Sequence, residues 1–464
     1  MKITEELNEL AEVFKRKGRK LYIVGGAVRD DLLGLQTYEV DYNLCSDVTP
    51  VELLDVLEGS RFMPENINGN IGIMAIVGKQ SYQHSTFRKD LYDSQTHKLI
   101  SFNFINSLEE DAKRRDFKIN ALYYDISNKK IIDPFGGLKD IESKTLSTTR
   151  NPRIIYEDDP ERLLRAIRFS TIFNFTIPEN ELEVLKNNFY RLKELPKSKI
   201  RGEFEKFLHL DNYYIKYEKG KNAHYKALKT LGDFGLWEYF LPSLVEWQNL
   251  AIFNEKGEKY YDFILNELKF ADSDLRLCSI IENISKAELL KRQLKESDLD
   301  EVITEIIDLN LGETGLDYPK EDFIDVKKII FGADFMCGLF TTKTKIREFI
   351  FDNRFVFNAI LKLKRTREYE AKKEKKHLKT LELLTSEYDA IKAEKYPLTI
   401  DELNIYGEEL IRAFPEIKLE RLDDFREGIL RRLVVQKKSN TKYDLIMLGS
   451  QEIKSNPDFY VDQF

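Results

Sequence analysis

The chain contains few cysteines and few histidines. Only three cysteines and five histidines occur among its 464 residues. Cys45, Cys278 and Cys337 lie far apart, so they lack the paired spacing of a zinc site and suggest buried free thiols in a reducing cytoplasm. The histidines form no pair at metal-ligand spacing. No His-Asp pair typical of phosphohydrolases is visible after residue 150, so no second hydrolytic activity is predicted.

Long apolar runs are also missing. No stretch of about 18 apolar residues could span a bilayer. Residues 1–18, MKITEELNELAEVFKRKG, have the pattern of a charged amphipathic helix and not of a signal peptide. We therefore expect no membrane partner and a cytoplasmic location.

Composition indicates a globular protein of several domains. Hydrophobic residues make up 42% of the chain and charged residues 33%. A chain of 464 residues is too long for one typical core, so roughly two to four domains are expected. The net charge of −7 argues against a protein that coats polyanions over its whole surface, but it allows a local basic face.

Strand patterns are concentrated in the first third of the chain. Residues 73–77 and 131–132 have the apolar pattern of strands, and residues 49–57 have that of a helix capped by Thr49. After Arg150 strand signals nearly vanish. The sequence therefore predicts an α+β protein, with a mixed α/β N-terminal domain followed by all-helical domains.

One of the expected helices spans residues 180–195. Asn180 would cap its start and Pro196 would end it.

The segment from Leu21 to Pro50 carries the strongest chemical signal. It has the pattern of an apolar strand, a turn at Gly25 and Gly26, and a helix. Glycines at such a turn let backbone N–H groups approach an anion, where the helix dipole favours negative charge. This part of the segment predicts a phosphate-binding turn.

A second strand is expected directly after this helix. Glu39, Asp41 and Asn43 occupy alternate positions and would share one face of it. Neighbouring carboxylates repel each other unless a positive charge lies between them, and Mg²⁺ binds carboxylate and phosphate oxygens together. A phosphate-binding turn beside a metal-binding strand predicts nucleotidyl or phosphoryl transfer.

An ordered series of motifs resembles the class II CCA-adding tRNA nucleotidyltransferases and the related bacterial poly(A) polymerases. The motifs are Gly25-Gly26-Ala27-Val28-Arg29-Asp30 with Leu32-Leu33-Gly34 and an acidic strand ending at Thr49-Pro50; Phe87-Arg88; Arg114-Arg115-Asp116-Phe117-Lys118-Ile119-Asn120-Ala121; Asp133-Pro134-Phe135-Gly136-Gly137; and Asp158-Asp159-Pro160-Glu161-Arg162-Leu163-Leu164-Arg165-Ala166-Ile167-Arg168-Phe169.

The resemblance implies a function and a domain order. The function is template-independent addition of CMP and AMP, from CTP and ATP, to the 3′ end of tRNA, with Mg²⁺ as cofactor and two cations in the reaction. The order is a nucleotidyltransferase head over residues 1–150, then a helical neck over 151–240, a body over 241–360 and a tRNA-binding tail over 361–464. No protein partner is implied.

The resemblance also assigns nucleotide-binding residues in the head. Arg29 would meet the triphosphate beside Gly25 and Gly26. Asp116 and Asn120 would bind the ribose, and they would share a helix face if their segment is helical. Arg115 lies beside them in the sequence.

Three neck residues complete the nucleotide site. Asp159 and Arg162, three apart on a helix, would present hydrogen-bonding edges to the incoming base. Arg165 would support this pair from the next turn.

The metal-binding residues depart from the family pattern. Asp41 is the expected catalytic carboxylate and metal ligand. Its partner is Glu39 if the motif is counted forward from Gly34, and Asn43 if it is counted back from Pro50. A third family carboxylate falls on Gln83. The acidic site is therefore thinner than the pattern, which favours a catalytically degenerate RNA-binding relative as one alternative.

A second departure lies in Tyr92–Lys98, which lacks an Arg and a Pro of the family's loop after the Phe-Arg motif. Addition of CCA, of CC alone, of A alone or of a poly(A) tail therefore all remain open.

Basic residues gather over residues 362–379. Such a run is typical of a solvated helix face, and it is also the pattern expected for phosphate contacts. In a tRNA-binding tail, the candidate RNA contacts are Lys364, Arg365, Arg367, Lys372 and Lys376.

Overall fold

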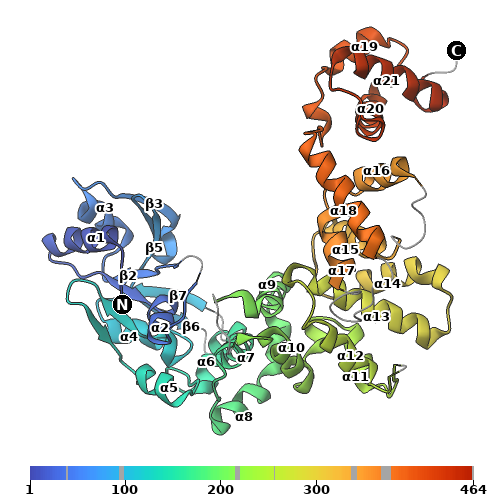
Figure 1. Cartoon of the computed structure of the whole chain (residues 1–464). Helices are drawn as coiled ribbons and strands as arrows, with labels where there is room; N and C mark the ends of the chain where they lie inside the picture. The colour runs from blue at the N-terminus through green and yellow to red at the C-terminus, as the bar shows by residue number, and fades with distance from the viewer. Residues whose placement is uncertain are drawn as a thin grey trace. The chain divides into compact units, whose positions relative to one another are not determined.

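The computed structural model describes residues 1–37, 40–92, 99–214, 220–254, 256–335, 342–366 and 378–461. The chain divides into two compact units (Figure 1). The first contains Met1–Leu265 and Asp308–Tyr318, and the second contains Asn266–Ile307 and Pro319–Phe464. Within the described ranges, all strands precede residue 133, and helices form the rest. The predicted α+β fold, a mixed head with a helical remainder, is confirmed.

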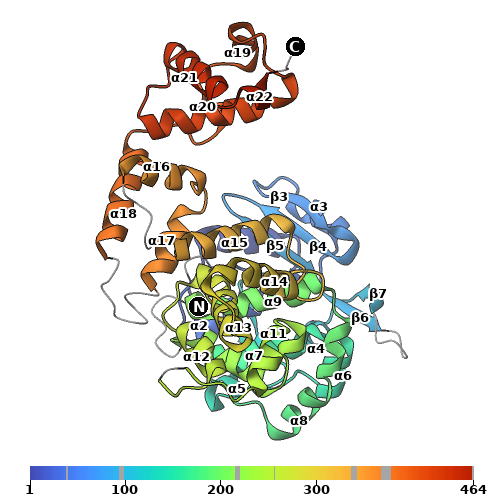
Figure 2. The same ribbon diagram turned by 90° about the vertical axis from the view of Figure 1, so that its right-hand side faces the viewer.

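The head is built on a seven-stranded sheet in the order β3-β4-β5-β2-β1-β8-β9. Strands β2 and β5 run parallel, and the other neighbours run antiparallel. Strands β6 and β7 form a separate hairpin, which lies to one side of the sheet (Figure 2). The strands are β1 Tyr22–Val24, β2 Leu44–Ser46, β3 Met63–Asn68, β4 Ile73–Val77, β5 Ser81–Thr86, β6 Arg88–Tyr92, β7 Leu99–Phe104, β8 Tyr123–Asp125 and β9 Lys130–Ile132.

Alternating side chains give the sheet two cores. On one face, Ile23 and Leu44 pack with residues of α1 (Glu5–Arg16) and α3 (Pro50–Leu57). On the other face, Tyr22 and Cys45 pack with residues that include Ala112 of α4 (Leu108–Lys113). Both faces are therefore apolar, as expected for a sheet covered on both sides.

The expected helix starts in the head are confirmed. Helix α1 begins after Thr4, whose hydroxyl accepts from the Leu7 N–H. Helix α3 begins with a capping box, in which Thr49 accepts from the Glu52 N–H and the Glu52 carboxylate accepts from the Thr49 N–H. The remaining short helices of the head are α2 Gly26–Leu32 and α5 Gly137–Ser143.

Helices follow the head directly. They are α6 Pro152–Asp158, α7 Glu161–Phe173, α8 Glu179–Asn187, α9 Lys197–Leu208, α10 Ala223–Asp233, α11 Ser243–Asn249 and α12 Tyr260–Glu267. The prediction of one helix over residues 180–195 was wrong. Helix α8 starts one residue earlier, after Pro178, and ends at Asn187, where Asn188 turns its side-chain amide back to the Val184 carbonyl. A 3₁₀ segment, Phe189–Glu194, follows.

The second unit is helical throughout its described residues. A buried arginine organises part of it: Arg347 of α16 pairs with Glu387 and Glu394 and donates to the Val434 carbonyl of α20. The helices are α13 Arg276–Arg292, α14 Leu299–Leu311, α15 Lys320–Phe335, α16 Lys343–Asp352, α17 Phe357–Arg365, α18 Leu378–Ala393, α19 Gly407–Ala413, α20 Leu422–Gln436, α21 Lys442–Ser455 and α22 Pro457–Tyr460.

Two of the three cysteines can be placed. Cys45 and Cys278 are buried, as predicted, and Cys337 lies outside the described residues. Among the described helices, none combines the length and the apolar character that a bilayer crossing requires.

Candidate functional site

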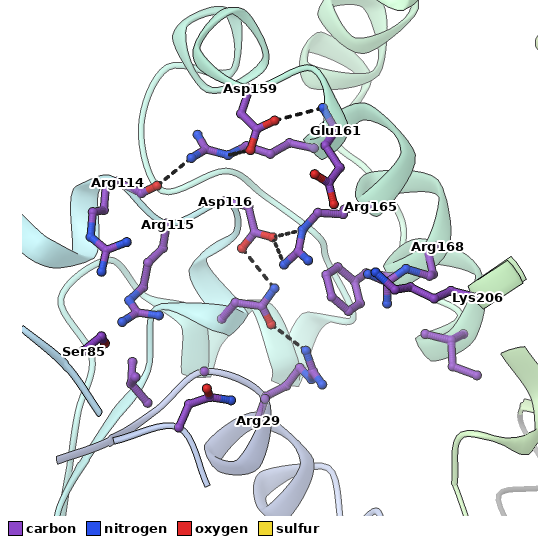
Figure 3. A pocket seen from close by; sticks show the side chains of 18 of the residues that line it. Arg29, Ser85, Arg114, Arg115, Asp116, Asp159, Glu161, Arg165, Arg168 and Lys206 are labelled. Carbon is purple, nitrogen blue, oxygen red and sulfur yellow. Dashed lines mark hydrogen bonds and ion pairs between the residues drawn. The ribbon is translucent and has the colours of Figure 1, made fainter. Parts of the chain in front are cut away.

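A cavity of 560 Å³ is lined by residues from inner strands of the head sheet and from helix α7 (Figure 3). Basic side chains dominate its lining, with eight Arg and Lys residues against three Asp and Glu residues. This excess of positive charge favours a polyanionic ligand. The basic residues are Arg29, Arg88, Arg114, Arg115, Arg162, Arg165, Arg168 and Lys206, and the acidic residues are Asp116, Asp159 and Glu161.

The glycine turn forms one side of this cavity. Strand β1 ends at Val24, and Gly25 adopts a φ of +80°, a backbone conformation that favours glycine. The Gly25 N–H donates to the Leu122 carbonyl at 3.2 Å, so this N–H is used within the protein. Gly26 then begins α2 and brings Arg29 beneath the cavity.

Arg29 is buried, with 5% of its surface exposed. Its guanidinium donates to Asn120 Oδ1 at 2.6 Å, to Asp30 Oδ1 at 2.8 Å and to the Tyr214 hydroxyl at 3.2 Å. The Phe173 ring lies 4.7 Å from its central carbon, at cation–π distance. Arg29 is therefore an interior link between the head and the helices that follow it, and not a surface ion pair.

Asp116 is the centre of a second group of polar contacts (Figure 3). Its carboxylate accepts from Asn120 Nδ2 at 3.0 Å and from two nitrogens of Arg165 at 2.8 and 2.5 Å. Burial alone would raise its pKa, but Arg165 and Asn120 outweigh that effect and lower the pKa to about 2. Asp116 is therefore an anion held in a fixed orientation.

Local structure brings Asp116 and Asn120 together without an α-helix. Helix α4 ends at Lys113, and Lys118–Asn120 form a single 3₁₀ turn. The expected supporting role of Arg165 is also corrected, because Arg165 pairs with Asp116 of the head and not with the Asp159–Arg162 pair.

The sequence had suggested that Asp159 and Arg162 lie on one helix, but they do not. Asp159 follows the last residue of α6, and Pro160 precedes α7, so the proline separates the two helices. The Asp159 carboxylate lies 3.8 Å from Arg162 Nε and accepts from the Glu161 N–H. Arg162 donates to the carbonyls of Ile155 and Arg114. Both side chains still line the cavity.

Arg115 has a buried acidic partner that the motifs did not single out. Asp111 accepts from Arg115 Nη2 at 3.2 Å, from Arg114 Nε at 2.8 Å and from the Tyr123 hydroxyl at 2.8 Å. Burial would raise the pKa of Asp111, but the two arginines lower it overall. Asp111 therefore fixes two arginines at the cavity wall.

The expected acidic strand is not formed as predicted. Strand β2 begins only at Leu44, and residues 40–43 are irregular. Strand β1 ends at Val24, whose N–H donates to the Asn43 carbonyl. Residues 40–42 therefore have no partner in β1. Asp41 is exposed and Asn43 is half-buried. Glu39 lies outside the described residues.

Asp41, Asn43 and Gln83 are nevertheless grouped. Asn43 Nδ2 donates to Asp41 Oδ2 at 3.3 Å. The parallel pairing of Leu44 with His84 places Asn43, just before β2, beside Gln83 within β5, and both line the 560 Å³ cavity.

Among the described residues, this donor set fits one divalent cation. Polymerase-type sites bind Mg²⁺ through one or two carboxylates together with substrate phosphates. Asp41 supplies one carboxylate, and the neighbouring amides supply uncharged oxygens. The described residues contain no group of three His, Cys, Asp or Glu side chains suited to a metal ion.

A second cavity, of 480 Å³, shares Gly26, Arg29 and Asn43 with the first and includes Asp41. Tyr213 also lines both cavities and is 47% exposed. The sequence motifs assigned no role to Tyr213 or Tyr214, because both follow the neck motif by more than 40 residues. Hydrogen bonds to Arg29 and Asp30 identify Tyr214, and its place in the lining of both cavities identifies Tyr213.

The basic tail residues are only partly described. Lys364 is 7% exposed, whereas Arg365 is exposed and donates to the Thr385 hydroxyl at 3.0 Å. Arg367, Lys372 and Lys376 lie outside the described residues.

Comparisons with known proteins give a consistent result. Residues 21–147 match the family described as "Poly A polymerase head domain". The CCA-adding enzyme of Ligilactobacillus salivarius is 28% identical over 308 residues, which cover 63% of this chain and 72% of that protein. Poly(A) polymerase I of Salmonella typhimurium is 28% identical over 283 residues, which cover 59% of this chain and 57% of that protein.

Solved structures extend the likeness to the whole fold. The crystal structure of the Bacillus stearothermophilus CCA-adding enzyme in complex with CTP is 20% identical, with a TM-score of 0.59, and the match covers 98% of each chain. Residues 21–147 therefore match the poly(A) polymerase head domain, and the chain is similar in sequence to CCA-adding enzymes and poly(A) polymerases, as its motifs predicted.

Proposed function

We propose that this protein adds CMP and AMP, from CTP and ATP, to the 3′ end of tRNA without a nucleic-acid template. The observation that carries this proposal is the basic 560 Å³ cavity, which the head and neck motifs line together. Its arginines suit a triphosphate, since guanidinium groups form paired hydrogen bonds with phosphate oxygens. Relatives with matching segments are named CCA-adding enzymes.

The reaction would join an RNA 3′-hydroxyl to the α-phosphate of the nucleotide and release pyrophosphate. Arg29, Arg114 and Arg115 lie at the head side of the cavity, where they would compensate phosphate charge. Asp116 and Asn120 are fixed by their contacts with Arg165 and Arg29, and they would orient the ribose. Asp159 and Arg162 would offer an acceptor and donors to the base.

Asp41 would hold one Mg²⁺ ion together with the phosphates of the nucleotide. Such an ion would supply positive charge at the reacting phosphate. Glu39 and Asn43 are the alternative partners of Asp41. We further propose that the protein acts in the cytoplasm, that residues 1–150, 151–240, 241–360 and 361–464 serve as head, neck, body and tail, and that exposed basic residues such as Arg365 contact the tRNA.

A second candidate is an RNA-binding relative that has lost efficient chemistry. Asn43 and Gln83 favour it, because each places an amide where the family pattern has a carboxylate. Addition of a poly(A) tail, of CC or of A alone also fits the same cavity, and the choice among them is a matter for experiment.

The test is incorporation of labelled CTP and ATP, alone and together, into tRNA transcripts that end before CCA, before the final A, or after it. Extension that stops at CCA is the expected result. Long A-tracts would instead indicate poly(A) synthesis, and a stop after CC would indicate partial addition. Binding of tRNA and CTP without extension would favour the degenerate relative.

A further inference from the structure

We infer that this protein binds a nucleoside triphosphate through its arginines without a divalent cation, and that it takes up a cation only together with the nucleotide. The feature responsible is the amide edge, which we define as Asn43 and Gln83 beside Asp41. The inference rests on the proposed function and specifies how the same site handles metal ions.

The position of the amide edge is fixed by strand pairing. Asn43 and Gln83 immediately precede the paired residues Leu44 and His84 of β2 and β5, and both border the cavity. Asp41 is joined to Asn43 by a hydrogen bond of 3.3 Å. One carboxylate and two amides therefore occupy the place where a cation would meet the phosphates.

Charge decides what this edge can bind. Mg²⁺ gives up its water reluctantly and prefers anionic oxygens, and the affinity of a cation site follows the charge of its ligands. Amide oxygens are uncharged, so the edge offers a free cation little compensation. The Asp41 carboxylate is exposed to water and accepts the Asn43 amide, so it is stable without a cation.

Arginines that line the same cavity supply the charge that the edge lacks. Arg114, Arg115 and Arg165 are each ion-paired, yet 18%, 17% and 31% of their side-chain surfaces stay exposed. Guanidinium groups bind phosphate oxygens through parallel N–H donors and keep their charge at all relevant pH values. A triphosphate can therefore be held before any cation arrives.

The experiment is calorimetric titration of the full-length protein with CTP, in EDTA and in Mg²⁺, and with MnCl₂ in the absence of nucleotide. For the parent protein we expect CTP dissociation constants within about twofold of each other in the two buffers, and no Mn²⁺ binding below millimolar concentration. The double variant N43D/Q83E restores two carboxylates. It should bind Mn²⁺ without nucleotide and should bind CTP about tenfold more tightly with Mg²⁺ than with EDTA.

Matched controls distinguish the effect of charge at the site from the effect of the protein's total charge. The variant N103D/Q451E adds the same two charges at exposed positions outside the cavity and should behave like the parent. The single variants N43D and Q83E, each checked by circular dichroism, replace the double variant if it does not fold.

Two results would overturn the inference. One is nucleotide-free Mn²⁺ binding by the parent at the affinity of N43D/Q83E. The other is CTP binding by the parent that disappears in EDTA. Failure of the proposed function is a different outcome, in which the parent binds no CTP in either buffer and extends no tRNA transcript.

Discussion

The two sides of the 560 Å³ cavity are built in different ways. The basic side is interlocked: Arg29, Asn120, Asp116 and Arg165 form one chain of hydrogen bonds that joins the head to α7. The acidic side, which continues into the adjoining 480 Å³ cavity, is a short irregular segment in which exposed Asp41 accepts a hydrogen bond from the Asn43 side chain. The first side positions a ligand with little room to move, whereas the second can change without disturbing the fold.

Because of this difference, we expect the basic side to determine ligand binding and stability, and the acidic side to determine the rate of the reaction. Removing a group from the interlocked side leaves other buried polar groups without partners, which costs stability. Removing an exposed group from the acidic side costs only what that group does for the reaction. Substitutions on the two sides should therefore affect different measurements.

The largest effect on activity is expected for Asp41→Ala. The variant should lose incorporation by about 1,000-fold, corresponding to about 4 kcal/mol of transition-state stabilisation, while its melting temperature and its CTP affinity stay at parent values. Labelled-nucleotide incorporation and calorimetry test this. Activity within twofold of the parent would remove Asp41 from the reaction.

The largest effect on stability is expected for Arg29→Ala. The change leaves Asn120, Asp30 and Tyr214 without a buried cationic donor, so urea denaturation should show a free energy of unfolding about 4 kcal/mol lower. Arg16→Ala, at an exposed position of α1, is the matched control and should change stability little. Equal stability of the two variants would contradict the interlocked description.

A pH effect should come from His84, behind the acidic side. His84 is buried, its Nε2 lies 2.7 Å from the Ser46 hydroxyl, and burial lowers its pKa from 6.5 to about 4. The unfolded chain takes up a proton near pH 6.5 and the folded chain only near pH 4, so stability falls as pH drops through this window, by about 3 kcal/mol in total.

His84→Gln keeps a polar group but removes the titration. Its free energy of unfolding, measured from pH 7 to pH 4, should fall less steeply than that of the parent. Parallel curves for the two proteins would show that His84 is not the group responsible.

The smallest effect concerns the partner of Asp41. Glu39→Ala and Asn43→Ala should each lower incorporation, and the larger loss, about tenfold, should mark the true partner. Initial rates at saturating CTP compare the two variants directly. Equal and negligible losses would mean that Asp41 acts without either neighbour.

The sequence predicted what local patterns encode. The cap at Thr49, the strand at residues 73–77 and the glycine turn depend on neighbours within a few positions, and the structure contains all three. The head and neck motifs together contain most residues that line the cavity, because each motif keeps its chemistry within a short stretch.

Contacts between distant residues were beyond such patterns. Arg165 was assigned to the wrong partner, since its pairing with Asp116 joins residues 49 positions apart. Tyr214 meets Arg29 across 185 positions and was not singled out at all. The predicted acidic strand was too long, because the alternation of acidic and apolar residues does not reveal where a neighbouring strand ends.

The ring and hydroxyl contacts of Arg29 have a practical consequence for anyone who dissects this protein. The strand-rich region ends near residue 150, yet Phe169, Phe173 and Tyr214, which surround Arg29, and Arg165, which holds Asp116, all come later in the chain. A fragment cut where the strands stop would expose Arg29 and Asp116 to water without their partners from the helices. The smallest excised piece that keeps its site whole must extend past Tyr214.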